Sequence, residues 1–394
     1  MPDPGLDIGA ILDRAEGRNG LPGLNVEQRR AVEDLSACRT AALGGRVEQC
    51  SCCGAREYLY NSCRNRHCPK CQANGRAEWL DREASYLLPV EYHHLVFTLP
   101  AEVAELARHN PRLIYGLLFE AASAAVREAA ANPKHLGAQV GLTAVLHTWG
   151  QTLSLHPHLH VMASGGGLSC NRTGEIDEPP TWRSCRPGFF LPVRVLGALF
   201  KGKFLAGLCQ ARQQGRLHPS AARAVLSCPV AWSAWLAVQR RLDWVVYSQP
   251  PSAGAAVVLK YLARYTYRVA ISNSRLLSVS DEAVTFSYKD YRHGGKQRRM
   301  TLSVEEFARR FLQHVLPRGF VRVRHYGLLA NRGREVKLLS CRRLLLAEPA
   351  RARQTTAAAE EQPRRCPACG EGVMCVVEVI AREPRARPQG EDSS

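Results

Sequence analysis

The stretch LSLHPHLHVMASGG (residues 153–166) places His156, His158 and His160 at alternate positions, ahead of an apolar, glycine-rich run. A period of two sends side chains to the same face of a β-strand. Three imidazoles on one face would make a poor core, but they would make a good start on a metal site. The alternative is a half-exposed strand on which the histidines are merely tolerated.

The composition describes a chain with an excess of positive charge. The 394 residues include 53 Lys and Arg against 35 Asp and Glu, a formal net charge of +18. The length allows two or three domains. An excess of this size suggests a polyanion partner, of which nucleic acid is the commonest. An anionic membrane surface is the competing partner, but no apolar run approaches the length of a bilayer span.

The cellular compartment decides how the 15 cysteines are interpreted. Residues 1–30 lack the charged start, apolar core and cleavage site of a secretion signal, which predicts a cytoplasmic protein. In a reducing compartment the cysteines are expected to be metal ligands or free thiols rather than disulfides.

A cysteine-dense block at residues 50–71 predicts a structural zinc site. Its two CxxC pairs are Cys50 with Cys53 and Cys68 with Cys71, which together offer four thiolates to a tetrahedral Zn²⁺. Cys63 and His67 lie between the pairs and are alternative ligands. A second zinc element is possible near the end of the chain, at Cys366, Cys369 and Cys375.

The periodicity of the remaining sequence predicts a mixture of helices and antiparallel strands. Alternating or apolar runs favour strands at 93–100, 139–149 and 158–167 and a meander over 268–273, 275–281 and 283–292. Helical spacing is expected at 25–40, 73–88, 101–131, 193–243, 255–266 and 304–317. The composition of 347–364 is typical of a linker.

The stretch LKYLARYTYRVAISN (259–273) carries two tyrosines at helical spacing. Tyr261 and Tyr265 would stand on one helical face, with Arg264 and Arg268 beside them as candidate phosphate-binding groups. A tyrosine hydroxyl can attack phosphorus if the developing charge is stabilised. The alternative is an amphipathic helix that buries both tyrosines in a core.

A divalent metal held by His158 and His160 would supply that charge stabilisation. With two neutral nitrogens plus oxygens from water and phosphate, Mg²⁺ or Mn²⁺ fits the chemistry. His156 is a possible extra ligand or proton carrier. The third ligand is left open between Gln151 and a distant carboxylate.

Taken together, these stretches resemble a known family. HPHLHV resembles the His-hydrophobic-His motif of the HUH nucleases, and YLARY resembles their two-tyrosine helix. The wider resemblance is to the two-tyrosine rolling-circle transposases of the insertion sequence 91 family. It is carried, in family order over residues 38–331, by CRTAALGG, NSCRNRHCPKCQ, LVFTLP, DWVVYSQPP, YLARYTYRVAISNSRL, SYKDYR and FLQHVLPRGFVRVRHYGLLAN.

The resemblance implies roles for the residues singled out above. Tyr261 and Tyr265 would be nucleophiles, and His158 and His160 would bind the catalytic metal. The N-terminal cysteines would bind zinc and help to recognise the ends of the element. The chain departs from its relatives at Arg46 and Tyr267, where histidine is common.

These expectations combine into an α+β protein with an antiparallel-sheet, HUH-type nuclease domain. The function expected is cleavage and rejoining of single-stranded DNA at insertion-sequence ends through 5′-phosphotyrosine intermediates. A plasmid or phage replication initiator and a non-catalytic zinc-dependent DNA-binding protein are the alternatives. The resemblance further implies a bacterial, nucleoid-associated location. The predicted parts are an N-terminal helical segment (1–45), a zinc-binding module (46–90), the nuclease domain (91–300), a basic C-terminal helical region (301–346), and a linker with the possible second zinc knuckle (347–394).

Overall fold

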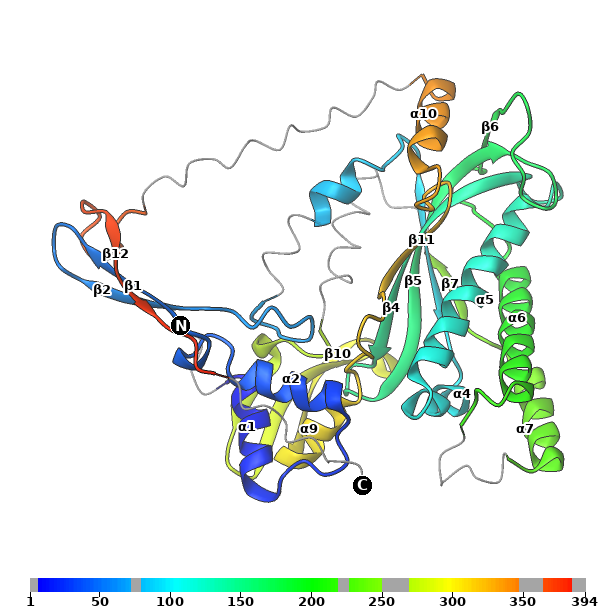
Figure 1. The fold of residues 1–394 in the computed structure, drawn as a ribbon. Coiled ribbons are helices and arrows are strands. Elements are labelled where there is room, and N and C mark those ends of the chain that lie inside the picture. Colours follow the sequence, from blue (N-terminus) through cyan, green and yellow to red (C-terminus); the bar gives the residue numbers. More distant parts are fainter. Residues whose placement is uncertain (1–5, 72–78, 219–226, 250–268, 347–363, 385–394) are drawn as a thin grey trace, which may run out of the picture.

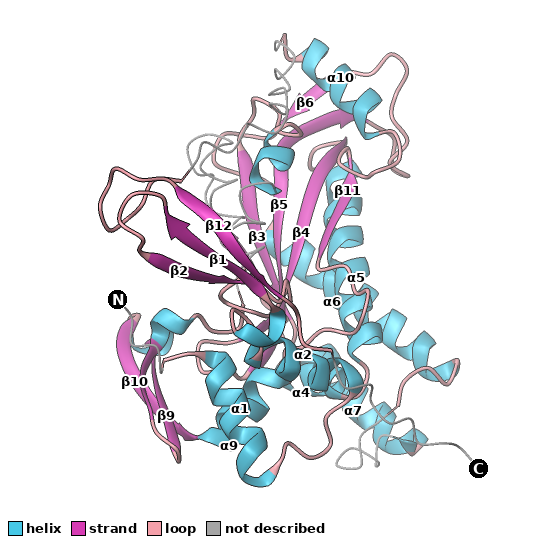
Figure 2. Cartoon of the chain, turned by 60° about the vertical axis from the view of Figure 1, so that its left-hand side comes forward, coloured by secondary structure: helices cyan, strands magenta, loops and turns pink. Residues whose placement is uncertain are grey.

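The computed structural model describes residues 6–71, 79–218, 227–249, 269–346 and 364–384. Over these residues the chain forms three antiparallel sheets, and helices lie against two of them (Figures 1 and 2). The α+β class expected from the sequence is confirmed. No helix among the described residues is long and apolar enough to cross a membrane.

The largest sheet has the strand order β11-β4-β5-β3-β7, and β6 pairs with the end of β5. The hairpin β4–β5 lies at its centre, while β7 and β11 join from later in the chain. Three of these strands, β3, β4 and β5, confirm the strands predicted from the sequence. The bounds are β3 (Tyr92–Thr98), β4 (Ala138–Trp149), β5 (Leu155–Ser169), β6 (Trp182–Ser184), β7 (Val246–Gln249) and β11 (Val323–Gly327).

Two long helices cover one face of this sheet (Figure 1). Alternate strand residues such as Phe97, Leu146 and Leu159 point into this layer and are fully buried with Phe119 and Phe200. Because strand side chains alternate, the residues between them face the other side of the sheet. The helices are α5 (Pro111–Ala131) and α6 (Val193–Gln213). The short elements α4 (Ala101–Glu105) and η2 (Leu106–Arg108) precede α5, and α7 (Pro229–Arg241) follows α6.

A second core joins the first helices of the chain to a late meander. Ile11 of α1 and Leu35 of α2 are buried with Phe286 of β9 and Phe307 of α9. The described part of the predicted segment 1–45, residues 6–45, is therefore not a separate unit, because its apolar faces pack against residues 270–312. The elements are α1 (Ile8–Asn19), α2 (Val26–Ser36), η4 (Asn273–Arg275), β8 (Leu276–Val279), β9 (Ala283–Asp290), η5 (Tyr291–His293), β10 (Lys296–Ser303) and α9 (Val304–Leu312).

The third sheet brings together strands from the N-terminal and the C-terminal part of the chain. It has the order β12-β1-β2, with β12 from the C-terminal part beside β1 from the N-terminal part (Figures 1 and 2). The predicted zinc-binding module (46–90) and the predicted C-terminal part (347–394) therefore contribute strands to one and the same sheet. Its elements are η1 (Ala41–Leu43), β1 (Gly45–Cys50), β2 (Arg56–Tyr60) and β12 (Met374–Ile380).

The region predicted as a basic C-terminal helical part, 301–346, is also divided. Its helix α9 belongs to the second core, whereas β11 pairs with β4 in the central sheet. Near the end of this region, α10 (Arg334–Leu344) is a helix with basic residues, as predicted. The expected strand at 268–273 is absent among its described residues 269–273, and the third meander strand is β10.

Candidate active site and zinc sites

Three histidines converge on the face of the central sheet opposite α5 and α6. His147 of β4 and His158 and His160 of β5 each offer a ring nitrogen, and these atoms lie within 4.8 Å of one another. His147 lies directly across from His158 in the β4–β5 register. Leu159, between the two β5 histidines, points into the helical layer. This histidine site can therefore bind a single cation.

The third candidate ligand, His147, is a residue that the sequence analysis did not single out. Gln151 is engaged elsewhere: its carbonyl accepts a hydrogen bond from Arg275 Nη2 at 2.6 Å, and its side chain faces the Lys289 amide at 3.4 Å. His147 is one histidine in an apolar strand, and only the cross-strand register brings it to His158. The sequence alone does not show this register, so it could not identify His147 as a candidate ligand.

The hydrogen bond of His158 fixes which of its nitrogens can bind a metal. Its Nδ1 lies 2.7 Å from the carbonyl oxygen of His156. A carbonyl oxygen only accepts, so Nδ1 carries the proton. In the neutral ring the lone pair is then on Nε2. His158 is half-buried, whereas His147 and His160 are almost completely buried, so the histidine site is most accessible at His158.

His160 is oriented by a chain of side chains across three strands. Its Nδ1 lies 2.9 Å from Nε2 of His94 on β3, and His94 Nδ1 lies 3.1 Å from Oε1 of Gln249 on β7. The amide oxygen of Gln249 accepts from His94 Nδ1, so His94 Nε2 must accept from His160 Nδ1. Burial lowers the pKa of His94, which favours this neutral form. His160 is left with its lone pair on Nε2, as a metal ligand requires.

His156 lies beside the histidine site without belonging to it. Its ring centroid is 5.1 Å from that of His158. The structure therefore groups His147, rather than His156, with His158 and His160.

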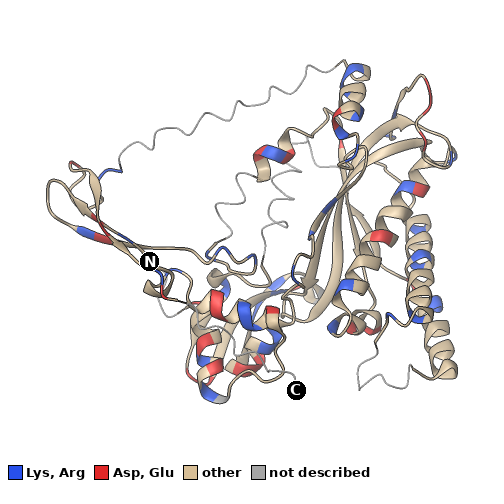
Figure 3. Cartoon of the chain, viewed as in Figure 1, with Lys and Arg blue, Asp and Glu red and all other residues tan. Residues whose placement is uncertain are grey.

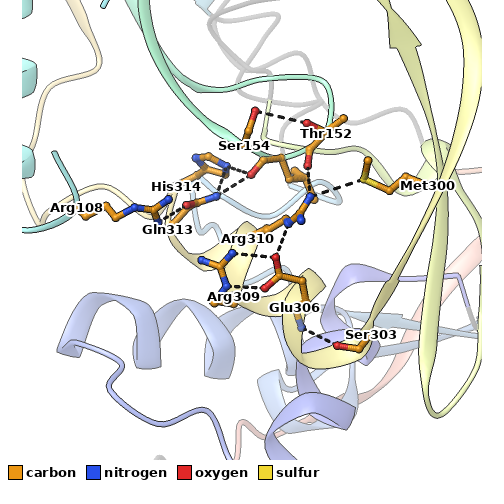
Figure 4. A network of polar contacts seen from close by, with 11 residues as sticks. Arg108, Thr152, Ser154, Met300, Ser303, Glu306, Arg309, Arg310, Gln313 and His314 are labelled. Carbon is orange, nitrogen blue, oxygen red and sulfur yellow. Dashed lines mark hydrogen bonds and ion pairs between the residues drawn. The ribbon is translucent and has the colours of Figure 1, made fainter. Parts of the chain in front are cut away.

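The turn that connects the two histidine strands is held by α9 and the residues after it (Figure 4). The carbonyl of Leu153 accepts from Gln313 Nε2 at 2.7 Å and contacts His314 Nε2 at 3.2 Å. Arg310 donates to the Thr152 carbonyl at 3.3 Å. Leu153 itself is fully buried in the second core with φ of 60°. The second core thereby fixes the turn from which β5 starts.

The two tyrosines and two arginines predicted beside the metal site lie outside the described residues. Tyr261, Tyr265, Arg264 and Arg268 all fall within 250–268. Their assigned roles stay predictions.

Four cysteines near the N-terminus form the first of two sulfur clusters. We call Cys38, Cys63, Cys68 and Cys71 the N-terminal cysteine cluster. Sγ atoms of Cys38 and Cys71 are 3.5 Å apart, and those of Cys63 and Cys71 are 3.6 Å apart. Tetrahedral zinc with Zn–S of about 2.3 Å places its sulfurs about 3.8 Å apart. The cluster therefore fits a closed Zn²⁺ site.

The second cluster combines cysteines from both ends of the chain. We call Cys50, Cys53, Cys366 and Cys369 the joining cysteine cluster. The Sγ atoms of Cys50 and Cys369, and those of Cys53 and Cys366, are 3.7 Å apart in each pair. The amide of Gly372 donates to Cys369 Sγ, and backbone donors lower the pKa of that thiol to about 6. This cluster has the same tetrahedral fit.

The predicted ligand set Cys50, Cys53, Cys68 and Cys71 is therefore wrong in its grouping. The two CxxC pairs belong to different clusters because β1 and β2 extend the first pair toward β12. Cys63 is in the N-terminal cysteine cluster, but His67 is not: its Nε2 accepts from the Leu316 amide at 3.3 Å.

Two further details of the zinc prediction change. Cys38, which the sequence analysis did not consider, completes the N-terminal cysteine cluster. The exposed Cys375 stays outside the joining cysteine cluster, because β12 begins at Met374 and carries it away from the knuckle.

Two protein families match this chain, one over most of the central sheet and one over the cysteine-rich N-terminal part. Residues 141–336 match a family described as "Putative transposase", and residues 14–99 match "Transposase zinc-binding domain". The chain is 48% identical over 367 residues to the "Putative transposase y4qJ" of Sinorhizobium fredii, covering 91% of this chain and 90% of that protein. It is 30% identical over 317 residues to the "Transposase for insertion sequence element IS801" of Pseudomonas savastanoi pv. phaseolicola, covering 79% and 72%. No solved structure matches.

The antiparallel sheet with paired histidine strands, the cysteine clusters and the two family matches together define a DNA transposase of the HUH type with a zinc-binding domain. The chain belongs to the insertion sequence 91 family of transposases.

Proposed function

We propose that this transposase cleaves and rejoins single-stranded DNA at insertion-sequence ends, through 5′-phosphotyrosine intermediates, in rolling-circle transposition. The observation that carries the proposal is the meeting of three imidazoles on paired central strands. Transposase relatives across most of the chain favour this function over a plasmid or phage replication initiator. They also favour it over a zinc-dependent DNA-binding protein without catalysis.

The donor set of the histidine site suits a divalent cation. His147, His158 and His160 supply three neutral nitrogens, which Mn²⁺ accepts more readily than Mg²⁺ does. A bound Mn²⁺ or Mg²⁺ would polarise the scissile phosphate and stabilise the charge that develops on it. His94 and Gln249 hold the ring of His160 in the tautomer that this binding needs.

Tyr261 and Tyr265 are the proposed nucleophiles. The oxygen of one tyrosine forms a bond to phosphorus, and the bond from phosphorus to the 3′-oxygen breaks. The proton that the tyrosine gives up balances the one that the 3′-oxygen gains. The products are a 5′-phosphotyrosine and a free 3′-hydroxyl, and the second tyrosine can cut or accept the other strand. Arg264 and Arg268 are proposed to bind the phosphates on either side.

The excess of positive charge supports DNA as the partner. Figure 3 shows Lys and Arg on most elements, including α6 and α10, while Asp and Glu are mixed with them on α1, α2 and α9. A protein that binds the element's DNA is expected at the bacterial nucleoid. The N-terminal cysteine cluster, with structural Zn²⁺, is proposed to support recognition of the element ends.

The test uses single-stranded DNA from an element end and the full-length protein with Mn²⁺. We expect a covalent protein–DNA adduct that survives denaturation. Tyr261→Phe with Tyr265→Phe should abolish the adduct while DNA binding is retained, because only the attacking oxygens are removed. His147→Ala, His158→Ala and His160→Ala should each abolish it through loss of the metal.

His156→Ala is the matched control for the histidine variants. It removes an imidazole from the same strand face but not from the histidine site, so the adduct should persist. A phosphotyrosine link in the double-Phe protein would place the nucleophile elsewhere, with Tyr267 the first suspect. Adduct formation in chelator by a protein lacking His158 and His160 would refute the metal role.

A further inference from the structure

The joining cysteine cluster is held between segments more than 300 residues apart. Cys53 and Cys366 are separated by 313 positions, and Cys50 and Cys369 by 319. The family match to a zinc-binding domain covers residues 14–99 and leaves the C-terminal pair outside it. Something other than local sequence must therefore stabilise the meeting of these four thiols.

We propose that the joining cysteine cluster is a second structural zinc site, which closes a zinc ribbon split between the two ends of the chain. One half of this split ribbon is residues 45–60, with β1, the first knuckle and β2. The other half is residues 364–380, with the second knuckle and β12.

The knuckles have the backbone arrangement that thiolate ligands need. Amides of Cys52 and Cys53 donate to Cys50 Sγ at 3.3 and 3.4 Å. In the other half, the Ala368 amide donates to Cys366 Sγ and the Gly372 amide to Cys369 Sγ, both at 3.4 Å. In each half, therefore, N–H groups of that same half stabilise the negative charge of a thiolate.

Gly372 shows that the two knuckles approach closely. A Cβ at this position would overlap Cys50 Sγ and would lie 2.8 Å from Cys52 Cβ. The Ser51 amide donates to the Val373 carbonyl at 3.0 Å, and the Val373 amide to Ser51 Oγ at 3.1 Å. The contact requires a residue without a side chain at 372, because any side chain would push the cysteine pairs apart.

The apolar core of the split ribbon is too small to hold the halves together unaided. Its buried members are Cys50, Cys366 and Met374, two of which are ligands. Pairing of β1 with β12 and the bonds of Arg364 to Glu48 and Glu57 add polar contacts at a partly exposed surface. Because Arg364 is exposed to solvent in both ion pairs, and Glu57 is exposed in one of them, these pairs contribute little, and a fold of this size depends on a metal.

The zinc content of the full-length protein tests the proposal. With both cysteine clusters occupied, we expect two Zn²⁺ per chain by elemental analysis. Cys366→Ser with Cys369→Ser should reduce the content to one. Cys50→Ser with Cys53→Ser should give the same single zinc, and combining all four changes should remove no more. Cys375→Ser, an exposed thiol outside the joining cysteine cluster, is the matched control and should keep two.

Hydrogen exchange shows whether the zinc joins the two halves. In the Cys366→Ser, Cys369→Ser protein, amides of residues 45–60 should lose protection, although the substitutions lie over 300 positions away. Gly372→Ala removes no ligand and should produce the same loss of one zinc and the same deprotection. Unchanged exchange in the central sheet would show that each variant is folded.

The outcomes separate clearly. Two zinc ions retained after loss of Cys366 and Cys369, or one zinc in the unaltered protein, would overturn the second site. One zinc lost without any change in exchange at residues 45–60 would show a C-terminal metal site that does not join the ends. Neither result bears on the adduct chemistry of the histidine site.

Discussion

His94 acts on the proposed metal through another residue. Its Nε2 accepts from His160 Nδ1, and it is itself fixed by Gln249. We expect His94→Gln to weaken Mn²⁺ binding by about 10–100-fold, because the ring of His160 loses the partner that sets its tautomer. Titration calorimetry of the full-length protein measures this affinity without any need for turnover.

Two variants give this prediction its controls. Gln249→Glu keeps an acceptor for His94 Nδ1 and should preserve Mn²⁺ affinity. His93→Gln alters the neighbouring residue, which faces the other way and stacks on Phe190, and should also preserve it. Equal Mn²⁺ affinity in His94→Gln and the unaltered protein would mean that His160 needs no such partner.

Glu83 and His325 make opposite contributions to the pH dependence of stability. Burial raises the pKa of Glu83 from 4.5 to about 7 and lowers that of His325 from 6.5 to about 4, and the two side chains are 3.4 Å apart. Between about pH 4.5 and 6.5 the folded and unfolded states therefore bind the same number of protons at this pair. Its net effect on stability should be nearly flat in that range.

When either side chain is removed, the free energy of unfolding should depend on pH through the pKa shift of the one that is left. With His325→Gln, Glu83 still binds its proton more tightly when folded, so stability should fall as the pH rises from 4.5 to 7. With Glu83→Gln, His325 still binds its proton less tightly when folded, so stability should fall as the pH drops from 6.5 to 4. Urea unfolding across this range, compared with the unaltered protein, measures both. Parallel pH profiles in the two variants would contradict the assignment.

At the scale of single residues, sequence patterns predicted what lies within one strand or one knuckle. His158 and His160 were found because alternate spacing is a property of one strand. His147 and Cys38 were missed because their neighbours are set by cross-strand register and by a helix end packed in the second core. Such contacts are made by tertiary packing, so no local spacing reveals them.

At the scale of elements, the turn between β4 and β5 depends on Leu153. Its side chain is buried in the second core while its backbone has a positive φ. Leu153→Ala should cost about 2–5 kcal/mol, because it leaves a cavity. Leu153→Gly loses the same side chain but relieves backbone strain of about 1 kcal/mol, so it should be the milder change.

Denaturant unfolding of the two variants tests that order. Elsewhere in a protein glycine is usually more destabilising than alanine, so the reversal is specific to a left-handed backbone. Glycine as the more destabilising substitution would contradict the role of φ at residue 153. Both variants should also weaken Mn²⁺ binding, because the turn sets the start of β5.

The strands with a buried face were predicted more accurately than the exposed ones. β3, β4 and β5 have continuous buried stretches, and each was expected from its apolar run. β10, with the sequence KQRRMTLS, is exposed over most of its length and has no apolar alternation. Pairing with β9 makes it a strand, and that partner is not visible in its own sequence.

At the scale of the whole molecule, the net charge should control DNA affinity. With a formal charge of +18, binding must release many counterions from the phosphates. Between about 50 and 200 mM salt, the association constant for single-stranded DNA should fall on the order of 10³-fold. Fluorescence anisotropy over a salt series gives the slope. A nearly flat slope would remove phosphate contact as the main source of affinity.

The order of the domains along the chain was harder to predict than their kinds. A mixed fold, a cysteine-rich zinc part and a histidine strand followed from composition and motifs. That helices 8–36 pack against residues 270–312, and that residues 364–380 complete the N-terminal sheet, follows from contacts between distant segments. Sequence analysis assigns residues that are neighbours along the chain to the same domain. In this protein, the central sheet, the second core and the split ribbon are each built from segments that are distant in the sequence.

The split ribbon can close only late in the synthesis of the chain, because its second pair of cysteines lies near the C-terminal end of the sequence. A ribosome adds about 5–20 residues each second, so the 313 positions between Cys53 and Cys366 take about 15–60 s to synthesise. The N-terminal cysteine cluster can take up its metal early in that interval, since its four thiols all precede residue 72. Cys50 and Cys53 must wait, close to those competing thiols, until Cys369 has been made. Chains interrupted before that point would carry the central sheet but an open ribbon. Closure of the ribbon therefore distinguishes them from chains translated past residue 369.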